Sequence, residues 1–303
     1  MDKSMYYGYI VKGDLHGAIR YIRQFPQQRD LYHRFMAVFE QEQYITYPID
    51  TSLNALLRAY QQYYRDVFYL CIHKKQAADK LKNRLKALCG MPNANIDLCD
   101  LEQKELTRIF RYHGLHFLGG QTGGYYGPYS WQTSKTVSYE VELPDGIQTY
   151  AVKLLDGFIT RSWIDYLSFG EIGPGGWADR DGTIHCIQSS WDFQSESFRV
   201  SLLKHEAQHA RDIQSGKEMS SEELEYRAKL VELIYSRERN LLKEFAQEAD
   251  PIDMENGHAR AAYRIMKGFS EILGTDAVDP ARLSIEQIQT VAATLFEKSQ
   301  RNR

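Results

Sequence analysis

The sequence predicts an α+β fold in which an all-helical N-terminal region, residues 1–112, precedes a domain of antiparallel β-meander followed by helices, residues 113–303. Three observations predict it. Helical periodicity dominates the first region, apolar and polar residues then alternate between glycine-containing turns, and helical periodicity returns near residue 191. A chain of 303 residues can form one large domain or two modest ones with a substantial core.

The N-terminal region is predicted to be helical because residues 49–88 contain no glycine or proline and repeat apolar residues at helical spacing. This stretch predicts two helices. Its basic residues, from Lys74 to Lys86, are interleaved with Asp79, which indicates the solvated face of a helix.

The middle of the chain is predicted to form an antiparallel meander of three strands. Apolar residues alternate with polar ones over residues 137–143, and Pro144-Asp145-Gly146 predicts a turn into a second strand at residues 147–155. A second Asp-Gly pair predicts another turn into a third strand at residues 158–169.

The last third contains the pattern with the most chemical content, His205-Glu206-Ala207-Gln208-His209, in a predicted helix that ends before Gly216. Residues four apart lie above each other on one helix face, so both imidazoles can bind one metal ion. Glu206 lies beside them and can act as a base without binding the metal. The alternative is a pair of core histidines that satisfy each other through hydrogen bonds.

A catalytic zinc site needs a third protein ligand, and Glu225 is the candidate. A second helix is predicted to begin at Ser220, whose spacing from Glu223 matches a capping box. Two helices joined by so short a connection pack antiparallel, which places Glu225 opposite His209. Its apolar neighbours make a carboxylate without a partner costly. A plain surface glutamate is the alternative.

Three residues are candidates for supporting roles. Asp212, one turn after His209, can orient a metal-binding imidazole or be an ordinary surface residue at a helix end. His258 begins a helix on its apolar stripe, where the helix dipole favours a neutral imidazole that donates a hydrogen bond. His258, or Tyr263 one turn later, can stabilise the oxyanion of a tetrahedral intermediate. Satisfied core residues are the alternative for both.

With these residues assembled, the chain resembles the zincin metallopeptidases, and among them the gluzincins, whose third zinc ligand is a glutamate on the next helix. His205 and His209 match the two motif ligands and Glu206 the general base, whereas Glu225 matches the third ligand by spacing and helix position. The resemblance covers residues 174–235. It departs from the usual pattern at residue 211, which is arginine instead of apolar, and lacks the Asn-Glu-x-x-x-Asp pattern around the third ligand.

The resemblance implies a zincin-like catalytic domain within residues 113–303 and a zinc-dependent hydrolase, with Zn²⁺ as its cofactor, that cleaves a peptide or other amide bond. A peptide or protein substrate would pair with an edge strand before the motif helix. Residues 177–178 or 183–187 can provide that strand. Two alternatives remain: a non-enzymatic binding or scaffold protein with an inactive zincin-like core, and a metal-dependent enzyme acting on a non-peptide substrate.

Composition argues against several other classes of protein. The net charge of −3 and pI near 6.3 argue against nucleic-acid binding, and no apolar run approaches the length of a membrane span. The N-terminus lacks the features of a signal peptide, and the four cysteines show no disulfide or CxxC spacing. A reducing cytoplasm is the expected location. No pattern in the sequence specifies an oligomeric state.

Overall fold

The chain forms two compact units, each with its own hydrophobic core. The computed structural model describes residues 1–252 and 256–301. The first unit consists of Met1–Thr133 and Gly157–Pro174, and the second of Ser134–Asp156 and Gly175–Arg303. Both helices and strands are present, as the α+β prediction requires. The predicted boundary between residues 112 and 113 lies inside the first unit, because residues 113–133 pack with the helices that precede them.

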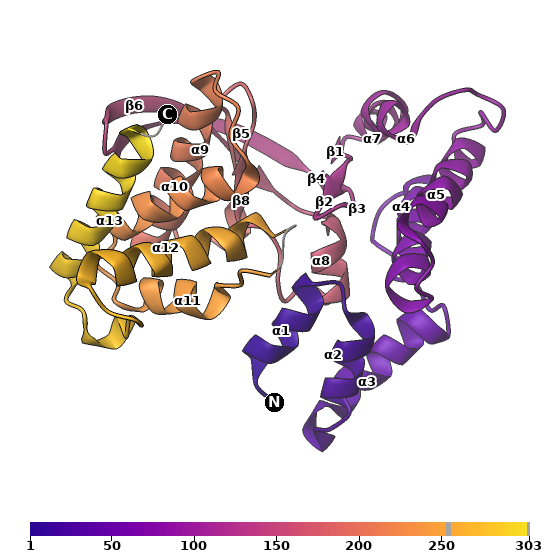
Figure 1. The fold of residues 1–303 in the computed structure, drawn as a ribbon. Helices are drawn as coiled ribbons and strands as arrows, with labels where there is room; N and C mark the ends of the chain where they lie inside the picture. The colour runs from indigo at the N-terminus through magenta and orange to yellow at the C-terminus, as the bar shows by residue number, and fades with distance from the viewer. Residues whose placement is uncertain (253–255, 302–303) are drawn as a thin grey trace. The chain divides into compact units, whose positions relative to one another are not determined.

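The elements within residues 1–112 are all helical (Figure 1). They are α1 (Lys3–Val11), α2 (Leu15–Ile22), η1 (Pro26–Gln28), α3 (Arg29–Phe35), α4 (Thr51–Tyr64), α5 (Lys74–Leu88), α6 (Leu98–Asp100) and α7 (Thr107–Tyr112). Wider π-helical turns extend α3 and α4 and join α6 to α7; these are η2 (Met36–Glu40), η3 (Arg65–Tyr69) and η4 (Leu101–Leu106). The two helices predicted for residues 49–88 are therefore confirmed as α4 and α5.

The core of the first unit encloses a carboxyl group. Glu102 is 1% exposed and accepts a hydrogen bond of 2.6 Å from the hydroxyl of Tyr60. Gly119 lies so close that a Cβ atom there would approach the Cβ of Glu102 to 2.6 Å, which only glycine avoids. Burial raises the pKa of Glu102 to about 7, although the hydrogen bonds from Tyr60 and the backbone of Gly120 act in the opposite direction.

The strands of the first unit are short. β1 (His116–Leu118), β4 (Tyr129–Trp131) and β7 (Thr160–Arg161) form an antiparallel sheet, and β2 (Gln121–Thr122) pairs with β3 (Tyr125–Tyr126). The third strand predicted at residues 158–169 is wrong, because after β7 the chain forms α8 (Ser162–Leu167). Trp163, Tyr166 and Leu167 are buried at spacings of three and four, which is the period of a helix and not of a strand.

The sheet of the second unit has the strand order β5 (Thr133–Leu143), β6 (Gly146–Asp156), β9 (Ile184–Ile187) and β8 (Gly176–Ala178). The predicted turn between β5 and β6 is confirmed. The uninterrupted antiparallel meander is wrong, since β9 runs parallel to β6 and only β8 pairs antiparallel with β9. The chain leaves this unit after β6 and returns at Gly175 to form the edge strand β8. It then reverses direction into β9, which lies between β8 and β6 and runs parallel to β6.

Helices cover the sheet of the second unit and form most of its core (Figure 1). They are α9 (His205–Gln214), α10 (Ser221–Tyr235), α11 (Asn240–Glu248), α12 (Gly257–Leu273) and α13 (Ile285–Arg301), with the shorter turns η5 (Gln188–Ser190), η6 (Phe198–Lys204) and η7 (Pro280–Arg282). Helix α10 is central and packs against α9, α12 and α13. No helix of the described residues combines the length and the apolar character that a membrane crossing requires.

Candidate metal centre

The motif helix is anchored by its apolar face. A π-helical turn, η6, continues directly into α9 at His205, and such turns occur frequently at functional sites. Leu202 of η6 and Ala207 and Ala210 of α9 are buried in the same cluster as residues of β6 and β9, so this face of the continuous helix packs on the sheet. The two histidines on the adjacent face are thereby turned toward α10.

The hairpin of α9 and α10 forms as predicted. Helix α9 ends at Gln214, Gly216 adopts a left-handed φ of 70°, and the Ser220 side chain caps α10 by accepting from the N–H of Glu223. This connection brings Glu225 beside both histidines. The atoms that can bind a metal on His205, His209 and Glu225 all lie within 4.8 Å of one another.

The spacing of these atoms fits a zinc ion. His205 Nε2 and His209 Nε2 are 3.0 Å apart, and the Glu225 oxygens lie 3.5 Å and 3.4 Å from them, respectively. Ligand bonds of about 2.0–2.1 Å in a tetrahedral site place neighbouring ligand atoms roughly 3.3 Å apart. Two imidazole nitrogens and one carboxylate are also the ligand types of a catalytic zinc site, which leaves its fourth position open.

A second carboxylate, which sequence reasoning missed, orients His205. Glu232 Oε1 accepts a hydrogen bond of 2.7 Å from His205 Nδ1, and both residues are buried. This bond leaves Nε2 of His205 as the atom that faces Glu225 and can bind a metal. The signal was present in the sequence, because Glu232 follows Glu225 by seven residues, or two helical turns, and therefore lies on the same face of α10.

His258 reaches this cluster from the first turn of α12. Its Nδ1 lies 2.9 Å from Glu225 Oε2, while 56% of its side chain is exposed, so the alternative of a satisfied core histidine is wrong. Asn256 caps this helix by accepting from the N–H of Ala259. Tyr263 is 43% exposed, and no hydrogen bond or ion pair of the described residues joins it to the cluster.

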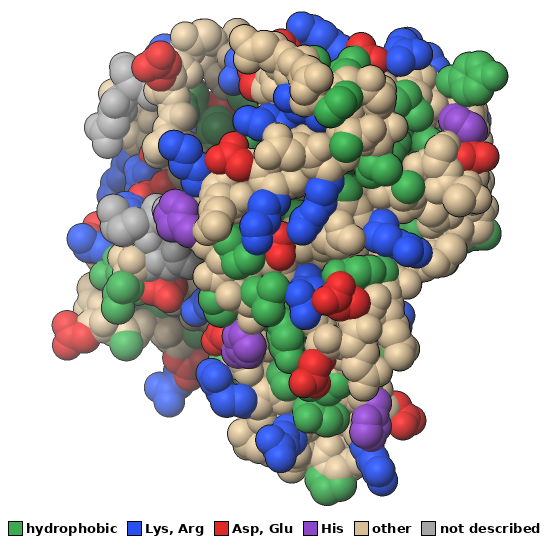
Figure 2. Space-filling model, turned by 90° about the vertical axis from the view of Figure 1, so that its right-hand side faces the viewer, with side chains coloured by type: hydrophobic (Ala, Val, Ile, Leu, Met, Phe, Trp, Pro, Cys, Tyr) green, Lys and Arg blue, Asp and Glu red, His purple; other side chains and the backbone are tan. Residues whose placement is uncertain are grey.

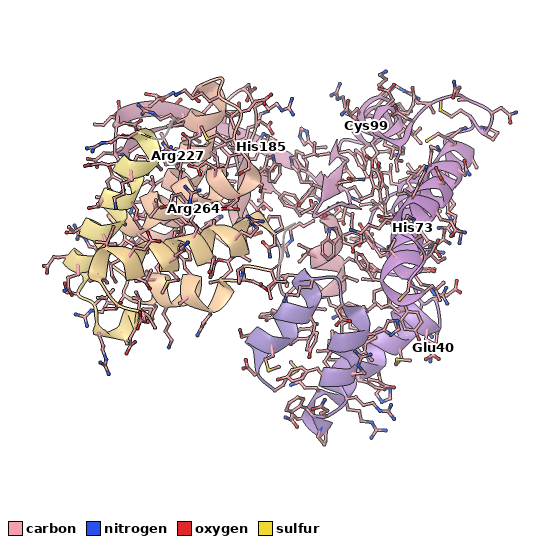
Figure 3. The ribbon with its side chains drawn as sticks, in the orientation of Figure 1. Glu40, His73, Cys99, His185, Arg227 and Arg264 are labelled. Carbon is pink, nitrogen blue, oxygen red and sulfur yellow. The ribbon has the colours of Figure 1, made fainter. Side chains whose placement is uncertain are left out.

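Asp212 has a different partner from the predicted one. Its Oδ2 accepts a hydrogen bond of 2.7 Å from Arg227 Nε, and both side chains are almost fully buried. Arg227, labelled in Figure 3, also donates to Ser299 Oγ at 2.7 Å, and its guanidinium lies 4.3 Å from the ring centre of Phe296. This network joins α9, α10 and α13. The predicted orienting role is wrong, because the carboxylate is turned toward Arg227 and the Nδ1 of His209 has no hydrogen-bond partner among the described residues.

Burial and the neighbouring polar groups have opposite effects on the pKa values of this cluster. Burial lowers the pKa of His205, but Glu232 and Glu225 outweigh this effect and raise it well above its usual value. Burial raises the pKa of Glu225, yet hydrogen bonds from His205, His209 and His258 outweigh it and lower that pKa. A cation that binds here must therefore displace protons from imidazole nitrogens.

One edge of the sheet next to the motif helix has no neighbouring strand among the described residues. Strand β8 ends the sheet, whereas β9 lies between β6 and β8 and cannot be the edge. The hydrogen bonds to β9 use alternate residues from Gly175 to Asp179, so Gly176 and Ala178 direct their N–H and C=O groups outward. His185, which lies on β9 and is labelled in Figure 3, is bonded to Asp179 at 2.7 Å and is not part of the metal cluster.

Comparison with known proteins adds no relative: no family model, curated protein or solved structure matches this chain. The functional assignment accordingly depends on the geometry of the site itself.

Proposed function

We propose that the second unit is a zincin-like catalytic domain and that the protein is a zinc-dependent hydrolase of peptide or other amide bonds. The observation that carries the proposal is the convergence of His205, His209 and Glu225, with separations that suit one tetrahedral ion. Zinc held by these side chains would polarise a water molecule and lower its pKa to about 7.

Glu206 is the general base in this proposal. It lies about 100° around the helix from His205. Its side chain is only partly exposed and forms no hydrogen bond or ion pair within the described part of the chain. Its carboxylate is therefore available to take a proton from water and later to pass it to the leaving amine.

The residues around the ligands hold them in place. Glu232 selects the tautomer of His205, and His258 binds the oxygen of Glu225 that faces His205. The exposed remainder of the His258 ring can donate a hydrogen bond to a substrate oxygen, as proposed for a residue that stabilises an oxyanion. No observation supports the same role for Tyr263.

The open edge of β8 suits an extended peptide substrate. The outward N–H and C=O groups of Gly176 and Ala178 can form main-chain hydrogen bonds with a peptide added as a further strand. Gly176 is needed at this point, because a Cβ atom would clash with the main-chain oxygen of His185 on β9 and would lie 2.6 Å from Leu202 Cδ1.

A scaffold role without catalysis is the second candidate, and the same cluster supports it. Without a cation, the carboxylates of Glu225 and Glu232 already lie at ion-pair distance from the three imidazoles of the cluster. This candidate predicts a protein that is stable and takes up no zinc.

Metal content and turnover distinguish the two candidates. We expect about one zinc per chain in the purified protein by mass spectrometry, lost in His209→Ala and retained in the control His185→Ala, whose imidazole lies outside the cluster. Glu206→Gln should keep zinc but lose hydrolysis of a quenched-fluorescence peptide library, whereas Glu218→Gln, at an exposed site, should keep both. Absence of zinc after reconstitution would favour the scaffold, and wild-type turnover by Glu206→Gln would refute the mechanism.

A further inference from the structure

A groove in the first unit is independent of the metal cluster. It has a volume of about 590 Å³ and is formed by α4, α5 and the segment of residues 46–51. Ala55, Ala59 and Leu88 give it an apolar lining, and Leu88 is 49% exposed. Figure 2, which views the molecule from the side on which α5 lies in Figure 1, shows Lys and Arg side chains interspersed with apolar ones.

The segment beside the groove, residues 45–47, is hydrogen-bonded to side chains of α4 in the way that a β-strand is bonded to a neighbouring strand. The buried amide of Gln61 donates to the carbonyl of Ile45 and accepts from its N–H, both at 2.8 Å. Asn54 does the same for Tyr47, at 2.8 Å and 2.9 Å. Two side-chain amides of α4 thus replace a neighbouring strand at alternate residues.

This arrangement leaves an open main-chain edge. In an extended chain, the N–H and C=O groups of successive residues point to opposite edges, so those of Thr46 point away from the two amides. Thr46 is exposed, lines the groove and forms no main-chain hydrogen bond within the described part of the chain. A peptide laid along the groove can pair with it.

The charge of the groove selects among peptides. Its lining contains Arg58 and Arg84 and no acidic residue. Arg84 is paired with Asp66 at 3.2 Å, but Arg58 is exposed and has no ion-pair partner among the described residues. A guanidinium beside an apolar surface favours a ligand that has a carboxylate next to an apolar side chain.

We propose that this groove is a docking site for an extended peptide segment of a partner protein in which an apolar side chain is flanked by acidic residues. The apolar side chain enters between α4 and α5, the acidic side chain pairs with Arg58, and the main chain bonds to Thr46. The site does not depend on the zinc chemistry proposed for the second unit.

Selection of phage-displayed random peptides on the full-length protein tests the proposal. The enriched peptides are then synthesised, and their affinities are measured by fluorescence anisotropy. We expect a consensus of apolar and acidic residues, and Arg58→Glu should weaken binding about tenfold or more. Ala87→Trp, at an exposed position that lines the groove, should block it without changing charge. Lys75→Glu, an equal charge reversal on α5 away from the groove, should leave affinity unchanged.

Three results would each overturn the proposal. The selection could enrich no sequence, or it could yield a consensus without acidic residues. Peptide binding could also survive both Arg58→Glu and Ala87→Trp in variants whose circular dichroism is native. Decanoate in place of the peptides tests a fatty acid as the occupant. Binding of decanoate that depends on Arg58, with none of the peptides binding, would assign the groove to an acyl carboxylate instead.

Discussion

Glu102 should make the stability of the first unit decrease as pH rises through the neutral range. Its carboxyl group ionises near pH 4.5 in an unfolded chain and near pH 7 in the folded core. Below pH 4.5 the carboxyl is protonated in both the folded and the unfolded state, and the free energy of unfolding has its full contribution from Glu102. Between these values only the folded state holds the proton, so the free energy of unfolding falls with pH until both states are ionised.

The magnitude follows from the separation of the two pKa values. A difference of about 2.5 pH units, at 1.36 kcal/mol for each, corresponds to a loss of about 3 kcal/mol between pH 4 and pH 8. Because Glu102 is 1% exposed, solvent screening reduces this value little. Glu102→Gln carries a neutral amide at every pH and can still accept the hydrogen bond from Tyr60, so it should lack this dependence.

Hydrogen exchange measured by mass spectrometry on peptides from α4 provides the assay, because it reports the opening free energy of the first unit separately from the second. The wild-type protein and Glu102→Gln are compared from pH 4.5 to 8, with exchange corrected for its intrinsic pH dependence. Other titrating groups affect both proteins alike, so the difference between them isolates Glu102. If that difference changes by less than about 1 kcal/mol over this range, the carboxyl is not held protonated by burial and the reasoning is refuted.

The remaining predictions concern the second unit. Glu232→Gln should weaken zinc binding about 10- to 100-fold in competition with a chromogenic chelator, because the tautomer of the His205 ligand is less firmly held, and equal affinity would contradict that role. His258→Ala should also weaken zinc binding, while His258→Asn should restore part of it by donating to Glu225; equal loss in both would point to a purely structural role. Asp212→Asn should lower the free energy of unfolding in urea by about 3–5 kcal/mol, because a buried guanidinium loses its charged partner. A loss below about 1 kcal/mol would contradict that account.

Local signals of the sequence predicted the hairpin that carries the candidate site. The capping pair Ser220 and Glu223 and the left-handed Gly216 act within a few residues of themselves, and they determine where α9 ends and α10 begins. The predicted proximity of Glu225 to His209 followed from that hairpin, because two helices joined by a short connection pack antiparallel.

Turn signals of equal strength gave a wrong prediction where strand pairing depended on the long-range path of the chain. An Asp-Gly turn after β6 predicted a third antiparallel strand, but the chain crosses to the first unit there and forms α8. The partner of β6 is therefore a later strand, β9, and it runs parallel. Alternation along a strand indicates which faces are apolar and contains no information about which strand will lie beside it.

The sequence by itself thus determined the helical N-terminal region, the motif helix and the candidate ligands His205, His209 and Glu225, since each follows from helical spacing or a short connection. Only the tertiary structure decided that His258 reaches Glu225 and that Asp212 pairs with Arg227. These contacts join residues on different helices, and their partners are set by how the core packs, which no local pattern encodes.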